Sequence, residues 1–451
     1  MNRLIVDFSL KDGAVKPMHA VNNGPIYKFG ESMRVTNIDA FIEAGIPYVR
    51  NHDASFCATY GGEHTVDVHA IFPDFDADPY DPVSYDFAMT DEYVRVCEYA
   101  GCKTFYRLGS KIEHGIKKYG TVPPKDFHKW AVICEHIIRH YTEGWADGFY
   151  YDMQYWEIWN EADGNNDDDT NKLCWQGTHA EFYELYHVAA THLKGCFPHL
   201  KIGGPANSGR INLVEEFICQ CKAPLDFFSW HRYKSDPAPV MEFARKVRKI
   251  LDDNGFEQTE SILDEWNYVR SFSGAEWEYS LRREKDIKGA AYIAAMMCEC
   301  QREPVDMLMY YDARPCSMNG MFNTDLVCDK LKGYYPFLMF NSLYKLENSV
   351  PVRSDISGIY VCAGVNENET EGAIMITHFE DDDNAAPIEI MLDIQDFGAL
   401  EGTALELFIL DEMHDLSRVS YSIYLGNRFI TSLTLPNFTS YLIKIKKDIV
   451  L

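Results

Sequence analysis

Short apolar runs alternate with longer amphipathic segments over residues 18–346. The runs have the length and the β-branched and aromatic content of strands, whereas the segments between them repeat apolar residues at helical spacing. This pattern predicts eight strands: His19–Asn23, Pro47–His52, Lys103–Leu108, Tyr155–Asn160, Lys201–Pro205, Asp226–His231, Ser261–Trp266 and Met307–Asp312. Eight strand–helix units of this length close into a (β/α)₈ TIM barrel, an α/β fold whose reactive groups lie on the loops after the strands.

Local signals mark where several of the intervening helices begin and end. Thr178 and Glu181 form a capping box ahead of an apolar helical face. Gly45 follows the first helix, where a left-handed residue is favoured. Pro123-Pro124 and Pro336 are expected in the first turn of their helices, where the missing N–H costs nothing.

After about Leu346 the pattern changes to short alternating runs separated by polar turns. Such runs predict a small β-sandwich. We therefore divide the chain into a barrel over residues 16–346 and a sandwich over residues 347–451, with residues 1–15 contributing a strand to the sandwich. The acidic run Asp381-Asp-Asp383 is expected to be an exposed loop.

The 451-residue chain carries a formal net charge of −27, from 42 Lys and Arg against 69 Asp and Glu. This charge repels polyanions, so nucleic acid and anionic membrane surfaces are poor candidate partners. The sequence has no apolar stretch that approaches the roughly 18 residues of a membrane span. The 13 Cys include no CxxC pair, so reduced cytoplasmic thiols are expected. Homo-oligomerisation stays open.

Two glutamates stand where predicted parallel strands end: Glu161 in Trp159-Asn160-Glu161, and Glu265 in Asp264-Glu265-Trp266. Barrel enzymes keep their catalytic groups at this end of the strands. Hydrolysis of a glycosidic bond needs a proton donor for the leaving oxygen and a second carboxylate for the anomeric carbon. The two glutamates therefore predict a glycoside hydrolase whose partner is a small carbohydrate, with no cofactor and no metal.

The two motifs resemble those of glycoside hydrolase family 39. Three further segments resemble landmarks of that family: Ala44–Arg50 with His52, Val122–Trp130, and Asp226–Tyr233. The resemblance implies a retaining enzyme in which Glu161 is the general acid/base and Glu265 the nucleophile. The leading activity is that of a β-xylosidase. The expected cytoplasmic location favours an exo-acting enzyme on short oligosaccharides or glycosides.

The resemblance assigns roles to other residues near the predicted strand ends. Asn160 would bind the sugar 2-hydroxyl, Tyr233 would hold Glu265, and Arg50 would lie beneath Glu265 as a compensating charge. His52 and His231 would bind sugar hydroxyls. Aromatic faces for the sugar ring are expected at Trp266 and Tyr311.

One departure from the family pattern concerns the substrate. Arg107 stands about where xylosidases of the family carry a glutamate. Arg107 and Arg314 would clamp the carboxylate of a uronic acid if both faced the pocket. The plainer alternative is that each arginine pairs with a neighbouring Asp or Glu.

Several other functions stay open at this stage. Within the same chemistry, the alternatives are an α-L-arabinosidase, a β-galactosidase or glucosidase, and a uronidase. A non-catalytic carbohydrate-binding protein is a remote alternative. A metal-dependent hydrolase would need histidine ligands clustered with the carboxylates. The retaining assignment predicts carboxyl groups about 5–5.5 Å apart, and a gap of about 7 Å or more would indicate inversion.

Overall fold

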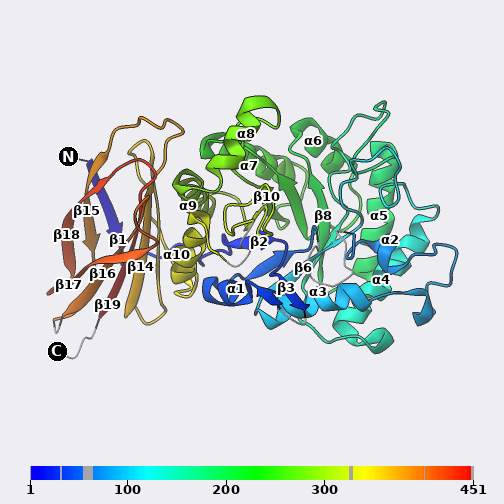
Figure 1. The fold of residues 1–451 in the computed structure, drawn as a ribbon, viewed down its shortest axis with the longest axis horizontal. Helices are drawn as coiled ribbons and strands as arrows, with labels where there is room; N and C mark the ends of the chain where they lie inside the picture. The colour runs from blue at the N-terminus through cyan, green and yellow to red at the C-terminus, as the bar shows by residue number, and fades with distance from the viewer. Residues whose placement is uncertain (1, 31–32, 54–63, 325–328, 401, 448–451) are drawn as a thin grey trace.

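The computed structural model describes residues 2–30, 33–53, 64–324, 329–400 and 402–447. A closed barrel of eight parallel strands forms its larger part (Figure 1). In chain order the barrel strands are β2 (Ala20–Asn22), β5 (Tyr48–Arg50), β6 (Lys103–Leu108), β7 (Tyr155–Ile158), β8 (Lys201–Asn207), β9 (Phe227–His231), β10 (Glu260–Trp266) and β11 (Met307–Tyr310). Each overlaps one predicted run, and the predicted fold class is confirmed.

Helices surround the barrel. They are α1 (Ile38–Ala44), α2 (Val68–Ile71), α3 (Ala88–Tyr99), α4 (Phe127–Glu143), α5 (His179–Cys196), α6 (Ile211–Gln220), α7 (Pro237–Asp253), α8 (Gly274–Arg283), α9 (Ile287–Arg302) and α10 (Tyr335–Tyr344), with 3-10 turns at Pro82–Ser84, Trp145–Asp147 and Lys332–Tyr334. In the described ranges, none of the helices combines the length and the apolar character needed to cross a bilayer.

The helix-end signals hold at three of the four places. Thr178 and Glu181 make the reciprocal hydrogen bonds of a capping box at α5, and Gly45 closes α1 with φ 58°. Pro336 lies in the first turn of α10. The expectation for Pro123-Pro124 is wrong, because α4 starts only at Phe127. The residue that caps this helix is Asp126, whose side chain accepts a hydrogen bond from the first turn.

The C-terminal strands form two sheets packed face to face. The larger sheet has the order β12-β13-β14-β19-β16-β17, and the smaller has the order β1-β15-β18. Their bounds are β1 (Asn2–Asp7), β12 (Asn348–Val350), β13 (Ile359–Val365), β14 (Glu371–His378), β15 (Ile388–Gln395), β16 (Thr403–Leu410), β17 (Ser417–Tyr424), β18 (Arg428–Leu435) and β19 (Ser440–Lys447). The N-terminal strand β1 runs parallel to β15, which places Leu4 opposite Leu392 in the sandwich core.

Helices α9 and α10 lie between the barrel and the sandwich (Figure 1). Almost every residue of α9 is buried, which fits its Ala-rich and Met-rich sequence. A helix that is covered by protein on both sides needs no polar face, because neither side contacts water. Met375 and Leu442 of the larger sheet belong to the same buried cluster as the barrel residues.

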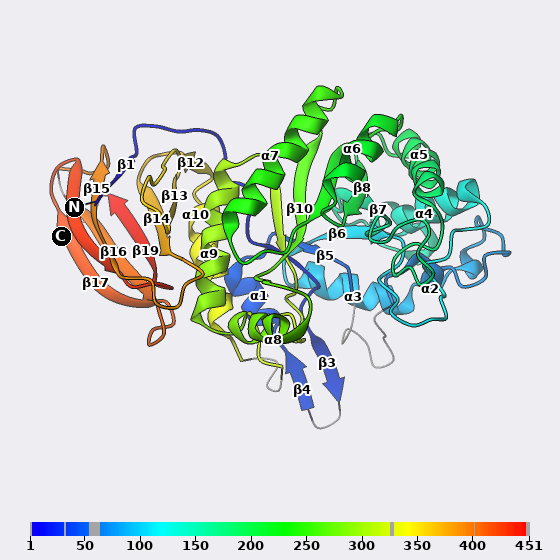
Figure 2. The same ribbon diagram turned by 90° about the horizontal axis from the view of Figure 1, so that it is seen from above.

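Two elements near the barrel mouth have no counterpart in the predicted pattern. One is a hairpin of β3 (Tyr27–Gly30) and β4 (Met33–Thr36), and the other is α8. Each follows the C-terminal end of a barrel strand. Figure 2 shows both projecting from the same end of the barrel, and Figure 1 shows them apart, with α8 above and β3 below.

Candidate active site

The backbone after β7 presents Glu161 at the mouth of the barrel. Trp159 and Glu161 both adopt left-handed φ values, 73° and 45°. Non-glycine residues pay about 1–3 kcal/mol for such conformations, which concentrate at functional sites. The turn is held because the Glu161 N–H donates to the carbonyl of Ala206 on β8 at 3.0 Å.

A β-bulge in β10 presents Glu265. The register of β10 against β9 shifts between Leu263 and Glu265. In a regular strand, neighbouring side chains point to opposite faces, and a bulge changes their directions. Here Asp264 and Glu265 both contact Arg50, at 3.1 Å and 2.8 Å. Trp266 instead packs in the core against Tyr292 of α9, so the expectation that it binds sugar is not met.

His231, the last residue of β9, lies between the two glutamates. Its Nδ1 is 2.7 Å from Oε1 of Glu161 and 3.5 Å from Oε2 of Glu265. One carboxylate oxygen of each glutamate and the histidine nitrogen all lie within 4.8 Å of one another. The two glutamates are 104 positions apart in the sequence, and the fold brings their carboxylates close together.

Glu265 is nearly inaccessible, with 5% of its surface exposed, and it is surrounded by donors. The hydroxyl of Tyr233 donates to its Oε2 at 2.8 Å, and Nε2 of His52 lies 3.3 Å from its Oε1. Burial alone would raise the pKa of this carboxyl, but His231, His52 and Arg50 outweigh burial and lower the pKa. The side chain is therefore ionised at neutral pH.

Arg50, at the end of β5, connects the groups beneath the site. Besides Glu265 it contacts Glu157 at 2.7 Å, and it donates to the side-chain oxygens of Asn160 at 2.7 Å and Asn22 at 3.0 Å. Burial works against its charge, yet the surrounding carboxylates raise its pKa. Arg50 thus lies where the sequence predicts it, and it also fixes the orientation of the Asn160 amide.

His231 is held as an imidazolium. Its burial would lower its pKa, but Glu265, Asp264 and Glu161 together raise it well above the usual value. The protonated ring has two donors. Nδ1–H donates to Glu161, and Nε2 faces Oδ1 of Asp264 at 3.5 Å.

The model of glycosyl hydrolases family 39 matches residues 46–331, which include both glutamates and every contact of the cluster except Asn22. This match covers more than half of the chain. The chain belongs to family 39. The resemblance drawn from the strand-end motifs is confirmed.

Two β-xylosidases are similar to this family 39 chain over part of its length. The chain is 26% identical over 197 residues to the enzyme of Caldicellulosiruptor saccharolyticus and 29% identical over 161 residues to that of Geobacillus stearothermophilus. The matches span 38% and 34% of this chain, and 38% and 29% of the respective relatives.

Among solved structures, a glucosidase from Croceicoccus marinus is similar over the whole of both chains. The TM-score is 0.80 and the identity is 23%. A likeness at that identity shows a shared fold and leaves the substrate of the family 39 chain to be decided by its own residues.

The sequence analysis did not identify Asp53, which lies beside His52 and contacts several polar and charged side chains. Asp53 accepts from Tyr311 at 3.1 Å and lies 3.0 Å from Lys111 and 3.1 Å from Arg314. It also faces Nδ1 of His52 at 3.1 Å. Burial opposes ionisation of Asp53, but these cationic neighbours hold its pKa well below the usual value. Its position directly after His52 at a strand end was the available signal.

The two arginines proposed as a uronate clamp are engaged by carboxylates of the chain itself. Arg107 is fully buried, pairs with Asp67 and donates to the carbonyl of His52 at 3.0 Å. Arg314 pairs with Asp312 at 3.0 Å as well as with Asp53. The plainer alternative therefore describes both residues, and Arg107 supports the site from behind without lining it.

Cys174 is a further residue that the sequence analysis did not connect with the site. Its thiol lies 3.9 Å from Oε2 of Glu161 and is buried. Burial, together with the charges of Glu161 and Glu265, raises the pKa of the thiol well above its usual value, so the group stays protonated. No sequence spacing pointed to this contact.

The triad of Glu161, His231 and Glu265 also has the donor atoms of a metal site. One contact opposes that use. The Arg50 guanidinium lies 2.8 Å from Glu265, and its positive charge would repel a cation bound there. The donor set fits proton transfer better than cation binding.

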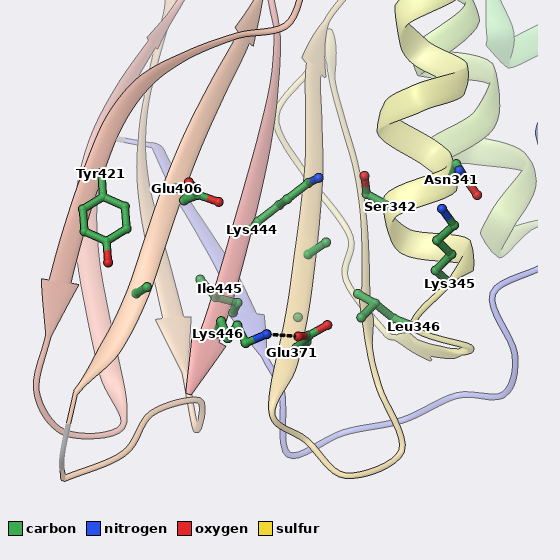
Figure 3. Close-up of a pocket in the computed structure, with 13 residues that line it drawn as sticks. Asn341, Ser342, Lys345, Leu346, Glu371, Glu406, Tyr421, Lys444, Ile445 and Lys446 are labelled. Atoms are coloured by element: carbon green, nitrogen blue, oxygen red, sulfur yellow. Dashed lines mark hydrogen bonds and ion pairs between the residues drawn. The ribbon is translucent and has the colours of Figure 1, made fainter. Parts of the chain in front are cut away.

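A separate hollow lies between α10 and the larger sheet of the sandwich (Figure 3). It has a volume of about 670 Å³ and is lined by polar groups such as Lys345, Lys444 and the Lys446–Glu371 pair. None of the residues that surround the two glutamates lines it. The hollow therefore has no part in the chemistry of the site.

Proposed function

We propose that this chain is a retaining glycoside hydrolase, with Glu265 as nucleophile and Glu161 as general acid/base. The observation that carries the proposal is the approach of the two carboxylates, whose nearest oxygens lie within 4.8 Å. Retaining enzymes have carboxyl groups about 5–5.5 Å apart, whereas inverting enzymes need about 6.5–9.5 Å to admit a water molecule.

In the first step, ionised Glu265 attacks the anomeric carbon while Glu161 donates a proton to the departing oxygen. Tyr233 and Arg50 hold one oxygen each of the attacking carboxylate, which fixes its direction. In the second step, Glu161 accepts a proton from the water that hydrolyses the covalent intermediate. The His231 imidazolium keeps Glu161 oriented through both steps.

The substrate that we propose is a short β-xyloside from which the enzyme removes a terminal sugar. The two partial relatives are β-xylosidases, and the polar cluster of Asn160, His52 and His231 supplies hydrogen-bonding groups for sugar hydroxyls. Glucosides, an alternative within the same chemistry, are the second candidate. A uronide substrate loses its main support, because Arg107 and Arg314 already have carboxylate partners.

Alanine substitutions test the roles of the glutamates. Glu161→Ala and Glu265→Ala are each expected to lose at least 10²–10⁴-fold in turnover of 4-nitrophenyl β-xyloside. Azide should restore turnover to Glu161→Ala with retained anomeric configuration, because this activated leaving group needs no proton. Glu184→Ala, which removes an exposed carboxylate on α5, is the control.

Each result bears on a different part of the proposal. Full activity in either variant would refute the catalytic assignment. An inverted first product, detected by proton NMR, would refute retention. A panel of nitrophenyl glycosides decides the sugar, and absence of turnover with every member would favour the non-catalytic sugar-binding alternative.

A further inference from the structure

An aromatic surface extends outward from the nucleophile. The ring of Tyr233, whose hydroxyl is bonded to Glu265, lies 5.3 Å from the ring of Phe272, centroid to centroid, at 78°. Phe272 in turn lies 5.4 Å from Trp277 at 35°. Phe272 belongs to the loop after β10 and Trp277 to α8, so both lie at the mouth of the barrel.

The outer part of this surface is open to solvent. Phe272 exposes 60% of its surface, and Trp277 is half-buried. Single exposed apolar residues are common on proteins and need no explanation. Here, however, the exposed ring continues a row of rings that starts at the reacting carboxylate, and the residues deeper in the site are charged or polar. The site is therefore polar near Glu265 and becomes apolar toward Phe272.

We propose that Phe272 and Trp277 form the binding wall for the leaving group of the substrate, and that they select leaving groups that contain a ring. This inference rests on the proposed glycosidase function. The sugar that is attacked must lie in the polar cluster against Glu265, so its leaving group points outward along the rings. Aromatic side chains bind flat apolar faces, which an aryl group and a pyranose both offer.

The sandwich holds this wall in place. Asp381 contacts Arg270, two residues before Phe272, at 2.9 Å, and Lys288 at 2.7 Å. It also accepts from the hydroxyl of Tyr268 at 2.6 Å. The Asp381–Asp383 run is a loop in which Asp382 and Asp383 are exposed, as expected, and Asp381 ties this loop to the barrel. A wall fixed before binding loses less entropy when the leaving group is bound.

The test compares three leaving groups on one sugar: β-xylosyl fluoride, 4-nitrophenyl β-xyloside and xylobiose. Phe272→Ala and Trp277→Ala should each lower kcat/KM for the two ring-bearing substrates by about 2- to 13-fold, the range of one aromatic contact. The fluoride should be hydrolysed at an unchanged rate, because its leaving group reaches no ring. If the panel of glycosides identifies another sugar, the same three leaving groups are compared on that sugar.

Two further variants separate binding from damage to the fold. Phe272→Tyr keeps the ring and should behave like the unmodified protein. Tyr99→Ala removes an exposed ring at the C-terminal end of α3, at the opposite end of the barrel, and should change none of the three rates.

Equal losses on all three substrates, or unchanged kcat/KM in both alanine variants, would overturn the leaving-group wall while leaving the glycosidase assignment intact. Absence of turnover by the unmodified protein on every glycoside would instead overturn the proposed function, and the inference with it.

Discussion

Removing the hydroxyl of Tyr233 tests how the ionised state of Glu265 is maintained. Tyr233→Phe deletes the 2.8 Å hydrogen bond to Oε2 and leaves the ring in place. The hydroxyl donates to the charged carboxylate, so it stabilises the ionised form and contributes to the lowered pKa of Glu265. Its loss therefore raises that pKa, and activity at acidic pH falls because the nucleophile must be ionised.

The magnitude follows from the charge on the acceptor. A hydrogen bond to a charged group contributes about 1.5–3 kcal/mol, and about 1.4 kcal/mol corresponds to one pH unit. The acid limb of the kcat/KM profile should thus move toward neutral by about 1 to 2 pH units. Initial rates of 4-nitrophenyl β-xyloside hydrolysis at low substrate concentration, measured from pH 3 to pH 8, give this limb directly.

Tyr311→Phe is the matched control. Its hydroxyl donates to Asp53 at 3.1 Å, so its removal should leave the acid limb where it is. An unchanged acid limb in Tyr233→Phe, or equal movements in the two variants, would refute the reasoning. An unchanged limb would mean that Arg50 and the histidines keep Glu265 ionised without the Tyr233 hydroxyl. Equal movements would mean that the change does not come from the hydrogen bond between Tyr233 and Glu265.

Three other outcomes are expected. His19 is fully buried, and burial lowers its pKa to about 3, so the folded state excludes a proton that the unfolded chain binds below about pH 6.5. The unfolding free energy should therefore fall by about 2 kcal/mol at pH 5. Urea unfolding of His19→Gln should show no such loss. Asp381→Asn should lower the unfolding free energy by about 1–3 kcal/mol, because Lys288 loses a charged partner, and it should reduce kcat/KM for xylobiose more than for the fluoride. Prolonged treatment with EDTA should leave turnover unchanged, and loss restored by a divalent ion would support the metal-dependent alternative.

The barrel was predictable because its strands are apolar runs with helical segments between them. A parallel strand buried on both faces leaves a short continuous run of apolar residues, as in Phe227-Phe-Ser-Trp, which polar loops bound on either side. The hairpin β3–β4 and helix α8 were not predicted, since they interrupt the repeat. Their sequences satisfy local rules for strand and helix, but nothing local says that they belong to the mouth.

The sequence predicted the site residues that lie at strand ends. It did not predict side-chain directions that depend on a bulge, or ion pairs with residues far away in the sequence. Alternation along a regular strand would send Asp264 and Glu265 to opposite faces, and only the register shift in β10 brings both to Arg50. Likewise, the partner of Arg107 is Asp67, forty positions away and outside the predicted strands. Sequence reasoning identified the charged residues but could not identify which of them neutralise one another.

The charges at the base of the site show why so many acidic groups can coexist there. Glu157, Glu161, Asp264 and Glu265 face two firmly positive groups, Arg50 and His231. Burial, although opposed by Arg50, raises the pKa of Glu157 to about 8, so this carboxyl is mostly neutral at pH 7. Asp264 and Glu265, whose pKa values are lowered, carry the negative charges that face the two cations.

This balance changes in a useful direction during the proposed reaction. When Glu265 becomes esterified to the sugar, its negative charge disappears. Arg50 and His231 keep their positive charges. The surplus positive charge lies beside Glu161, which has just lost its proton, and His231 is only 2.7 Å from it. The same cations that hold the nucleophile ionised in the free enzyme therefore stabilise Glu161 as the carboxylate that must accept a proton from water in the second step.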